Sequence, residues 1–139
     1  MKAWKFYESA INITKTIGNT KGQAQCYKNL GTTLQSLSQY DKAREYLEKA
    51  LAIDTGIGNR DGEATSYGNL RTLFHSIIQY DKAREYQEKA LAIRIEIDDR
   101  DGEATSYGNL RTLFHSLIQY DKAREYQEKA LAKIGRAHV

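Results

Sequence analysis

The feature that most constrains this chain is a block of letters, GEATSYGNLRTLFHS, at residues 62 to 76 that recurs unchanged at residues 102 to 116. Around this block, residues 99 to 132 match residues 59 to 92 at every position except Asn59/Asp99 and Ile77/Leu117. The offset is 40 residues, and a fixed period between about 20 and 50 residues is typical of solenoids and propellers. The sequence therefore predicts similar units stacked on one another.

The repeat pattern divides almost the whole chain. A more diverged copy keeps QYDKAREY and EKALAI, and the opening letters AWKFYESAINITKTIG align with the second half of a unit, AREYLEKALAIDTGIG. We therefore expect the second helix of a partial repeat at residues 1–18, full repeats at 19–58 and 59–98, and a truncated repeat at 99–133. The last letters, IGRAHV, leave the periodic pattern and resemble one reading frame of a sequencing adapter, so we expect residues 134–139 to be a non-native tail.

Each copy carries two apolar stripes at helical spacing. In the middle copy the stripes are Tyr67, Leu70, Phe74 and Ile77, followed by Ala83, Tyr86, Ala90 and Ile93. Between the stripes lie the letters QYD, in which Asp81 can serve the free N–H groups of a helix start, and between copies lies the turn-rich DDRDGE. These patterns predict an all-α fold of helix–turn–helix units, and a pair that cannot bury its own apolar face must stack on the next.

Composition narrows the class of function. The 139 residues carry 21 basic and 18 acidic side chains, mixed along the chain, whereas a nucleic-acid interface normally needs a clustered basic face. A single cysteine, Cys26, excludes a disulfide within the chain, and no apolar run is long enough to span a membrane. The opening residues lack the apolar segment of a secretory signal. We expect no nucleic-acid or membrane partner and a reducing, cytoplasmic setting.

The recurring residues resemble a known family. An aromatic-x-x-Leu-Gly pattern appears in Tyr27, Leu30 and Gly31, and small residues such as Ala43 and Ala50 follow in the second helix. With this pattern the chain resembles the tetratricopeptide repeat family, in the long 40-residue form of Pins-type G-protein-signalling modulators and large invertebrate tandem arrays. The resemblance implies a right-handed superhelical α-solenoid whose first helices line the concave surface.

Two departures from the family pattern concern the later copies. Arg71 and Arg111 stand where the family has the close-contact glycine that Gly31 retains, so the arginine stem must run outward or widen the helix pair. Ile78 and Ile118 stand where a glycine often ends the first helix in a left-handed conformation, which a β-branched residue adopts at a cost. We therefore expect the local geometry of the later copies to differ from the family pattern.

The resemblance also implies which side chains line the concave groove. The predicted peptide-binding residues are Lys28, Asn29, Thr32 and Gln35 in the first full copy, Asn69, Thr72 and His75 in the second, and Asn109, Thr112 and His115 in the third. Ser36, Gly68, Ser76, Gly108 and Ser116 map to the same surface.

The three asparagines are the most specific part of this prediction. An asparagine amide can both donate to and accept from the backbone of an extended peptide. With helices packed about 8–10 Å apart, one asparagine per repeat would meet roughly every third residue of a strand that rises about 3.3 Å per residue. The alternative is that the asparagine caps or braces the next helix.

Other candidate sites are weaker. Two histidines on one zinc ion would place their ligating atoms within roughly 4 Å of each other, whereas His75 and His115, in adjacent repeats, should be about 10 Å apart. We expect them to be solvated groove residues, and Cys26, which occupies the position of Ser66 and Ser106, to be a small packing residue. No phosphate-binding glycine loop, nucleophile elbow or metal-spaced Cys/His set is present, so we predict no catalytic residue, no metal and no cofactor.

These observations predict a non-enzymatic protein–protein interaction module or scaffold that binds an extended peptide segment of a partner in its concave groove. One alternative is a structural spacer that holds other domains apart. Another is a regulatory sensor arm of a larger multidomain signalling protein. Exposed apolar ends of the solenoid also predict end-to-end self-association.

Overall fold

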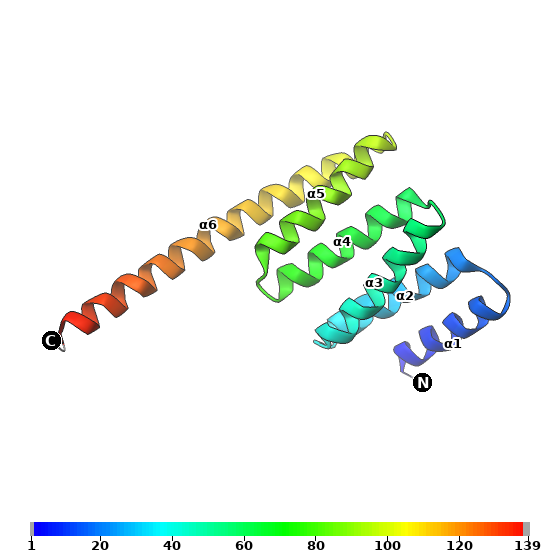
Figure 1. Cartoon of the computed structure of the whole chain (residues 1–139), viewed down its shortest axis with the longest axis horizontal. Coiled ribbons are helices and arrows are strands. Elements are labelled where there is room, and N and C mark those ends of the chain that lie inside the picture. Colours follow the sequence, from blue (N-terminus) through cyan, green and yellow to red (C-terminus); the bar gives the residue numbers. More distant parts are fainter. Residues whose placement is uncertain (1, 138–139) are drawn as a thin grey trace.

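A computed structural model describes residues 2–137 of the chain, with side chains up to residue 132. Within this range the protein forms six α-helices and no strand, which confirms the predicted all-α solenoid. The helices are α1 (Ala3–Thr16), α2 (Thr20–Ser36), α3 (Tyr40–Gly56), α4 (Arg60–Ser76), α5 (Tyr80–Glu96) and α6 (Arg100–Ala137). Each helix packs on the next along the chain, so the helices from α1 to α5 form a stack (Figure 1).

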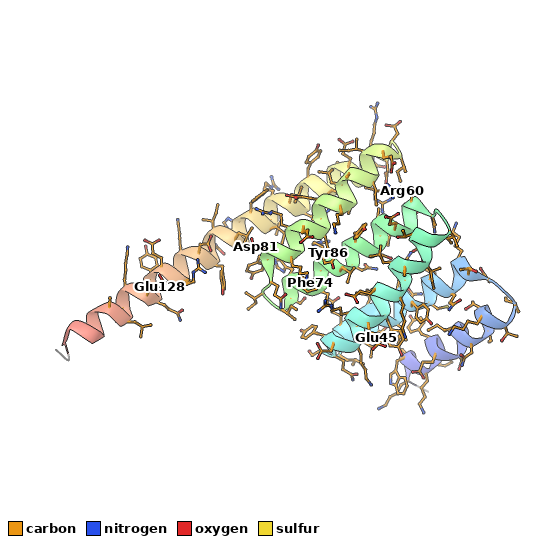
Figure 2. The ribbon with its side chains drawn as sticks, in the orientation of Figure 1. Glu45, Arg60, Phe74, Asp81, Tyr86 and Glu128 are labelled. Atoms are coloured by element: carbon orange, nitrogen blue, oxygen red, sulfur yellow. The ribbon has the colours of Figure 1, made fainter. Side chains whose placement is uncertain are left out.

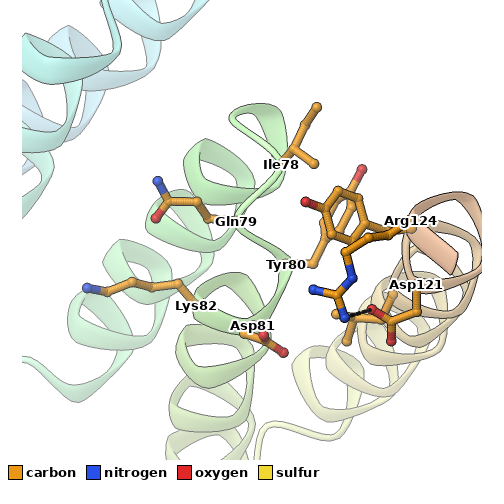
Figure 3. Close-up of a pocket in the computed structure, with 9 residues that line it drawn as sticks. Ile78, Gln79, Tyr80, Asp81, Lys82, Asp121 and Arg124 are labelled. Carbon is orange, nitrogen blue, oxygen red and sulfur yellow. Dashed lines mark ion pairs between the residues drawn. The ribbon is translucent and has the colours of Figure 1, made fainter. Parts of the chain in front are cut away.

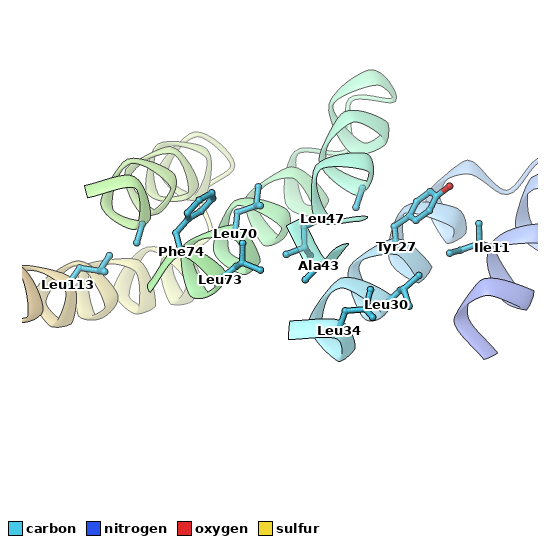
Figure 4. Close-up of a cluster of buried hydrophobic side chains, with 12 residues drawn as sticks. Ile11, Tyr27, Leu30, Leu34, Ala43, Leu47, Leu70, Leu73, Phe74 and Leu113 are labelled. Atoms are coloured by element: carbon cyan, nitrogen blue, oxygen red, sulfur yellow. The ribbon is translucent and has the colours of Figure 1, made fainter. Parts of the chain in front are cut away.

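The core runs through the stack as one continuous layer of buried apolar side chains (Figure 4). It extends from Ile11 on α1 through Leu30 and Leu47 to Phe74 on α4 and Leu113 on α6. Most residues of the predicted apolar stripes in the middle copy are buried, because residues three and four apart share one face of a helix: Leu70, Phe74, Ala83, Ala90 and Ile93. The solenoid is therefore stabilised by contacts between successive helices and not by one central core.

The first helix of each pair begins at a side-chain cap. The carbonyl oxygen of Asn19 and of Asn59 accepts a hydrogen bond from the backbone N–H of Gly22 (2.9 Å) and of Gly62 (3.2 Å). A carboxylate oxygen of Asp99 accepts from Gly102 in the same way, at 3.0 Å. These caps satisfy N–H groups that have no partner within the helix, so the start of each pair is fixed locally.

The turn between the two helices of a pair needs a left-handed residue. Ser38 has φ +60° and Ile78 has φ +62°, and a β-branched residue adopts this conformation at a cost of about 1–2 kcal/mol. The next helix begins after Gln39 or Gln79 without a side-chain cap. The expected role of Asp81 as a cap is therefore wrong. Its negative charge lies in the first turn of α5, where it interacts favourably with the helix dipole.

The third copy differs from the prediction. Instead of a helix–turn–helix unit, residues Arg100–Ala137 form one helix of 38 residues, and Ile118 continues the helix where Ile78 turns. Figure 1 shows α6 running beyond the stack. The physical reason is that α5 is packed against both α4 and α6, whereas the side chains of residues 121–132, in the second half of α6, are all exposed. The left-handed isoleucine is then not offset by enough contacts.

The tail expected at residues 134–139 lies outside the described side chains, and its last two residues lie outside the described backbone. No helix in the described part of the chain is both long enough and apolar enough to cross a membrane.

Candidate functional site

The first helices of successive pairs lie side by side and are joined by polar contacts. Gln35 on α2 donates from Nε2 to the Ser76 hydroxyl on α4 at 3.3 Å. One repeat later, Nε2 of His75 lies 3.4 Å from the Ser116 hydroxyl on α6. Because the same repeat positions are joined twice, α2, α4 and the first half of α6 form one continuous surface, which we call the first-helix surface.

A polar stripe follows this surface. It consists of one asparagine, one threonine and one serine per helix: Asn29, Thr32 and Ser36, then Asn69, Thr72 and Ser76, then Asn109, Thr112 and Ser116. Spacings of three and four residues place the members of each set on one face of their helix. None of the nine side chains is buried, so the stripe is open to a ligand.

The threonines of the stripe already donate their hydroxyl protons to backbone carbonyl groups of their own helices. Thr32 donates to the backbone carbonyl of Lys28 at 2.9 Å, and Thr72 and Thr112 donate to the carbonyls four residues before them, both at 3.1 Å. A hydroxyl oxygen retains acceptor capacity after it has donated. The threonines therefore present acceptors to an incoming group.

The stripe asparagines lie inside their helices and do not cap them, because the helix starts are capped by Asn19, Asn59 and Asp99. Asn29 accepts a hydrogen bond from Gln25 Nε2 at 3.1 Å, on the same exposed face of α2. The amides of the stripe are half-buried. A half-buried asparagine amide keeps donor and acceptor capacity toward solvent.

Lys28 differs from its expected role. Its side chain is 6% exposed, and its ammonium lies 2.8 Å from Oδ2 of Asp54 at the end of α3. The other carboxylate oxygen of Asp54 accepts from Asn59 Nδ2 at 3.1 Å. Lys28 therefore braces α2 against the α3–α4 connection, and its charge is already compensated within the protein.

The junction between the second and third copies has a basic residue at the end of its second helix, where the previous junction has the acidic Asp54. Gly68 replaces Lys28, and Arg94 replaces Asp54 at the end of α5. Nη1 of Arg94 pairs with Asp61 and lies 3.1 Å from Asp99, the residue that replaces the neutral Asn59. The signal for this site was present in the sequence, because all three of these positions change charge together between the copies.

A cavity of about 370 Å³ lies between the first halves of α2 and α4. Gln25, Lys28, Asp61 and Thr65 are among the residues that line it. The cavity continues the polar stripe toward the start of the helices, since Gln25 and Thr65 lie one turn before Asn29 and Asn69. All of the residues that line it are polar, charged or glycine.

The two histidines have different surroundings. The ring of His75 lies 5.0 Å from the ring of Tyr80, in addition to its contact with Ser116. His115 is exposed, with Nε2 3.0 Å from Gln119 Nε2. No group of three or more side chains suited to metal binding occurs among the described residues. The two histidines therefore belong to the first-helix surface without forming a shared centre.

Gly31 and Cys26 have structural roles. A Cβ atom on Gly31 would lie 2.7 Å from Leu47 and 3.2 Å from the Ala43 carbonyl, so α2 and α3 are too close here for a side chain without a shift of Leu47. In the second copy, Arg71 occupies this position, and burial lowers the pKa of its guanidinium. Burial also raises the pKa of the Cys26 thiol, which disfavours the reactive thiolate.

Solved structures share this arrangement of helices. BtubC (BKLC) from P. vanneervenii is 25% identical with a TM-score of 0.75, over 92% of this chain and 54% of that one. Aspartyl phosphate phosphatase F from Bacillus subtilis is 23% identical with a TM-score of 0.78, over 93% of this chain and 34% of that one. A Rap protein complexed with Competence and Sporulation Factor is 21% identical with a TM-score of 0.76, over 91% and 36% of the two chains.

The chain therefore spans about half the length of BtubC and about a third of the other two proteins. No curated protein matches the chain in sequence. The tetratricopeptide repeat family model, however, matches residues 1–56, 29–77 and 62–133. Since these matches cover nearly all of the sequence, the chain belongs to the tetratricopeptide repeat family.

Proposed function

We propose that this protein is a non-enzymatic interaction module that binds an extended peptide segment of a partner protein along the polar stripe. The observation that carries the proposal is the repetition of one asparagine, one threonine and one serine on three helices that lie side by side. A ligand with a repeating backbone is recognised by a surface that repeats at a similar spacing. We include a cytoplasmic setting in this proposal.

The chemistry of the stripe suits a peptide backbone. The asparagine amides can donate and accept, and the threonine hydroxyls offer acceptors, so both the C=O and N–H groups of an extended strand find partners. Such contacts tolerate different ligand side chains, because they address the backbone. Specificity would then come from the cavity beside Lys28 and Asp61 and from Gln35, His75 and His115 at the other end of the helices.

The comparisons support the proposal at the level of the fold. The similar Rap protein was solved complexed with Competence and Sporulation Factor, so a solenoid of this shape accommodates a partner. Tetratricopeptide repeats bind through many modest contacts that add along the array. Three repeats should therefore bind with low affinity, and a ligand that contacts all three helices should bind best.

The test is a peptide-library selection with the unmodified chain and a variant that carries Asn29→Ala, Asn69→Ala and Asn109→Ala. Circular dichroism first establishes that both proteins are equally helical. We expect the unmodified chain to enrich a shared motif and the variant to lose it, with at least a tenfold weaker affinity for the best peptide. Three lost hydrogen bonds of about 0.5–1.5 kcal/mol each are enough for this change.

The matched control carries Glu45→Ala, Glu85→Ala and Glu125→Ala, which remove one exposed side chain per repeat outside the stripe. This control should bind like the unmodified chain. Equal loss in both variants would show that capture depends on charge or stability and would contradict the stripe as the site. No enrichment by any well-folded protein would instead favour a spacer or a sensor arm.

A further inference from the structure

The second copy shows how the first helix of a pair is covered by both of its neighbours. Phe74 on α4 is 1% exposed. The guanidinium carbon of Arg44, on the preceding helix α3, lies 5.4 Å from the centre of its ring. From the following helix α5, the ring of Tyr86 lies 5.4 Å away and the ammonium of Lys82 lies 5.5 Å away. Figure 2 shows Phe74 and Tyr86 within this packed region.

The corresponding ring on α6 has a neighbour from the preceding helix but none from a following one. The guanidinium carbon of Arg84, on α5, lies 5.9 Å from the centre of the Phe114 ring. The residue is nevertheless 45% exposed. The counterparts of the covering side chains, Lys122 and Tyr126, lie further along the same straight helix and cannot fold onto it.

The uncovered side chains of the first half of α6 share one face of the helix. We call the four residues Ala104, Tyr107, Arg111 and Phe114 the open face of α6. They are spaced by three and four residues, which places them on one side of a helix. All four are exposed, whereas their counterparts on α4 are buried or half-buried. The open face of α6 is therefore the face that α5 covers on α4.

The second half of α6 does not lie over this face. The ring of Tyr120 lies 6.0 Å from the ring of Tyr80, at the start of α5. A cavity of about 450 Å³ lies beside residues 117–124, and residues 78–82 line its other side (Figure 3). The helix thus continues past the α4–α5 turn and leaves its own first half free.

The helix α1 has an open face that matches. Residues 3–18 correspond to residues 83–98 of the second copy, so α1 is the counterpart of α5. We call the four residues Ala3, Phe6, Ala10 and Ile13 the open face of α1. None of them is buried, and Phe6 and Ile13 are 58% and 60% exposed.

The counterparts of these residues on α5 are covered. They are Ala83, Tyr86, Ala90 and Ile93, of which the two alanines and the isoleucine are at most 4% exposed. Within one molecule, α1 packs on α2 through another side, where Ile11 is buried. The open face of α1 is therefore the face that α5 turns toward α4.

We propose that molecules of this protein associate head to tail, with α1 of one molecule packed antiparallel on residues 102–116 of another. In this arrangement α1 takes the place on α6 that α5 takes on α4. The two open faces differ and lie at opposite ends of the stack (Figure 1), so each molecule can bind one neighbour at each end. A contact of this heterologous kind gives open chains of molecules unless the rotation closes a ring. The inference does not depend on the polar stripe.

The arginine that lies on Phe114 does not obstruct this contact. In the second copy, Arg44 contacts the ring of Phe74 while two side chains of the following helix contact the same ring. Arg84 is the counterpart of Arg44. One ring therefore accommodates the arginine of the preceding helix and the side chains of the following helix together.

The side chains that Phe114 lacks are present on α1. Phe6 occupies the position of Tyr86, and Lys2 occupies the position of Lys82. Across the proposed contact, the ring of Phe6 packs on the ring of Phe114. The ammonium of Lys2 adds a cation–π contact of the kind that Lys82 makes in the second copy.

The same placement also continues the first-helix surface. Within one molecule, Gln35 on α2 donates to Ser76 on α4, which joins one repeat to the next. When α1 of a second molecule packs on α6, its α2 lies beside the first half of α6. His115 and Ser36 of the second molecule then occupy the same two repeat positions. The solenoid continues from one molecule to the next.

Disulfide cross-linking tests the orientation of the contact. A Cβ atom on Gly31 would lie 3.2 Å from the carbonyl of Ala43, and the corresponding positions across the contact are Arg111 and Ala3 of the second molecule. One protein carries Cys26→Ser with Ala3→Cys, and another carries Cys26→Ser with Arg111→Cys, both at exposed positions. After mild oxidation of the mixture, we expect a disulfide between one molecule of each, identified by mass spectrometry of the linked peptides.

The control replaces Arg111→Cys by Glu125→Cys, at an exposed position on the second half of α6. This protein should link to the Ala3→Cys protein with at least a tenfold lower yield. An equal yield in the control would overturn the proposal. Links between identical proteins in place of mixed ones would show a two-fold contact and would overturn it as well, as would the absence of any disulfide.

Light scattering tests the association without cysteine chemistry. For the unmodified chain, the mean mass should rise with concentration beyond that of a dimer, and a monomer at high micromolar concentration would overturn the proposal. Phe6→Glu and Phe114→Glu should each be monomeric, because each blocks one open face. Their equimolar mixture should form a dimer through the two faces that remain intact, and a monomeric mixture would contradict head-to-tail contact.

Two further variants separate this association from other effects. Tyr126→Glu changes an exposed ring outside both open faces and should associate like the unmodified chain, whereas a monomer would place the contact on the second half of α6. The Asn29→Ala, Asn69→Ala, Asn109→Ala variant should also associate like the unmodified chain. Failure of peptide binding and failure of association are therefore distinguishable.

Discussion

Residues 60–92 and residues 100–132 are nearly the same sequence, yet the first segment is a helical hairpin and the second is part of one helix. In the hairpin, Ile78 is left-handed, and in α6 the corresponding Ile118 is helical. The hairpin is covered by further helices on both sides, whereas the second half of α6 contacts little else. The comparison teaches that the turn is not encoded locally, because tertiary packing selects it.

This view explains why a strained residue is tolerated at the turn. A left-handed isoleucine costs about 1–2 kcal/mol, which is small beside the burial of Phe74, Leu70 and Ala83 between α4 and its neighbours. Where that burial is absent, the helix continues, since continuation keeps the backbone hydrogen bonds and relieves the isoleucine. In residues 60–92 the gain from burial exceeds the cost of the left-handed isoleucine, whereas in residues 100–132 it does not.

The largest contrast is expected for the aromatic residue that α5 covers. Phe74→Ala should lower the free energy of unfolding by about 3–5 kcal/mol, because it leaves a cavity in the core. Phe114→Ala should change it by less than about 1 kcal/mol, because the ring is nearly half exposed. Urea denaturation of both variants checks this, and equal losses would mean that the third copy is packed like the second.

A smaller contrast is expected at the close approach of the helices. Ala83→Leu should cost about 1–3 kcal/mol, because Ala83 is buried against α4 and the larger side chain has no room. Ala123→Leu should be nearly neutral, since the position is exposed and leucine is a good helix former. Thermal unfolding followed by circular dichroism distinguishes the two, and an equally costly Ala123→Leu would contradict the open surface on α6.

The parts of the fold that depend on the repeat period were predicted well from the sequence. The 40-residue offset and the apolar stripes gave the helix pairs, and the cost of a left-handed Ile78 was anticipated. The unbroken α6 was not, because the sequence around Ile118 differs from that around Ile78 only at Leu117. The repeat period predicts that each copy folds like the previous one, and it carries no information on which copies are covered by a neighbouring helix.

Part of the candidate site was also beyond sequence reasoning. The polar stripe follows from helical spacing, but its role as a peptide site stays a prediction. Lys28 was misplaced, because its partner Asp54 lies 26 residues away on the next helix. The caps at Asn19 and Asn59 were missed, although an asparagine three residues before a glycine at a helix start is a recognisable signal.

Glycine at the turn position should act with opposite signs in the two segments. Ile78→Gly should stabilise the protein by about 1 kcal/mol, because glycine adopts the left-handed conformation without strain. Ile118→Gly should destabilise the middle of α6 by about 1 kcal/mol, because glycine is a poor residue for a helix interior. Amide hydrogen exchange around each position gives both values, and the same sign at both sites would show that the two isoleucines share one conformation.

The smallest expected effect tests the comparison most directly. Leu117→Ile removes the one difference between residues 60–92 and residues 100–132, so the two segments become identical. The lower helix propensity of isoleucine should cost only a few tenths of a kcal/mol, and α6 should remain one helix, since packing and not residue 117 selects the conformation. Backbone chemical shifts at residues 116–120 report the result. A turn at these residues would show that a single leucine, and not the missing cover, holds α6 straight.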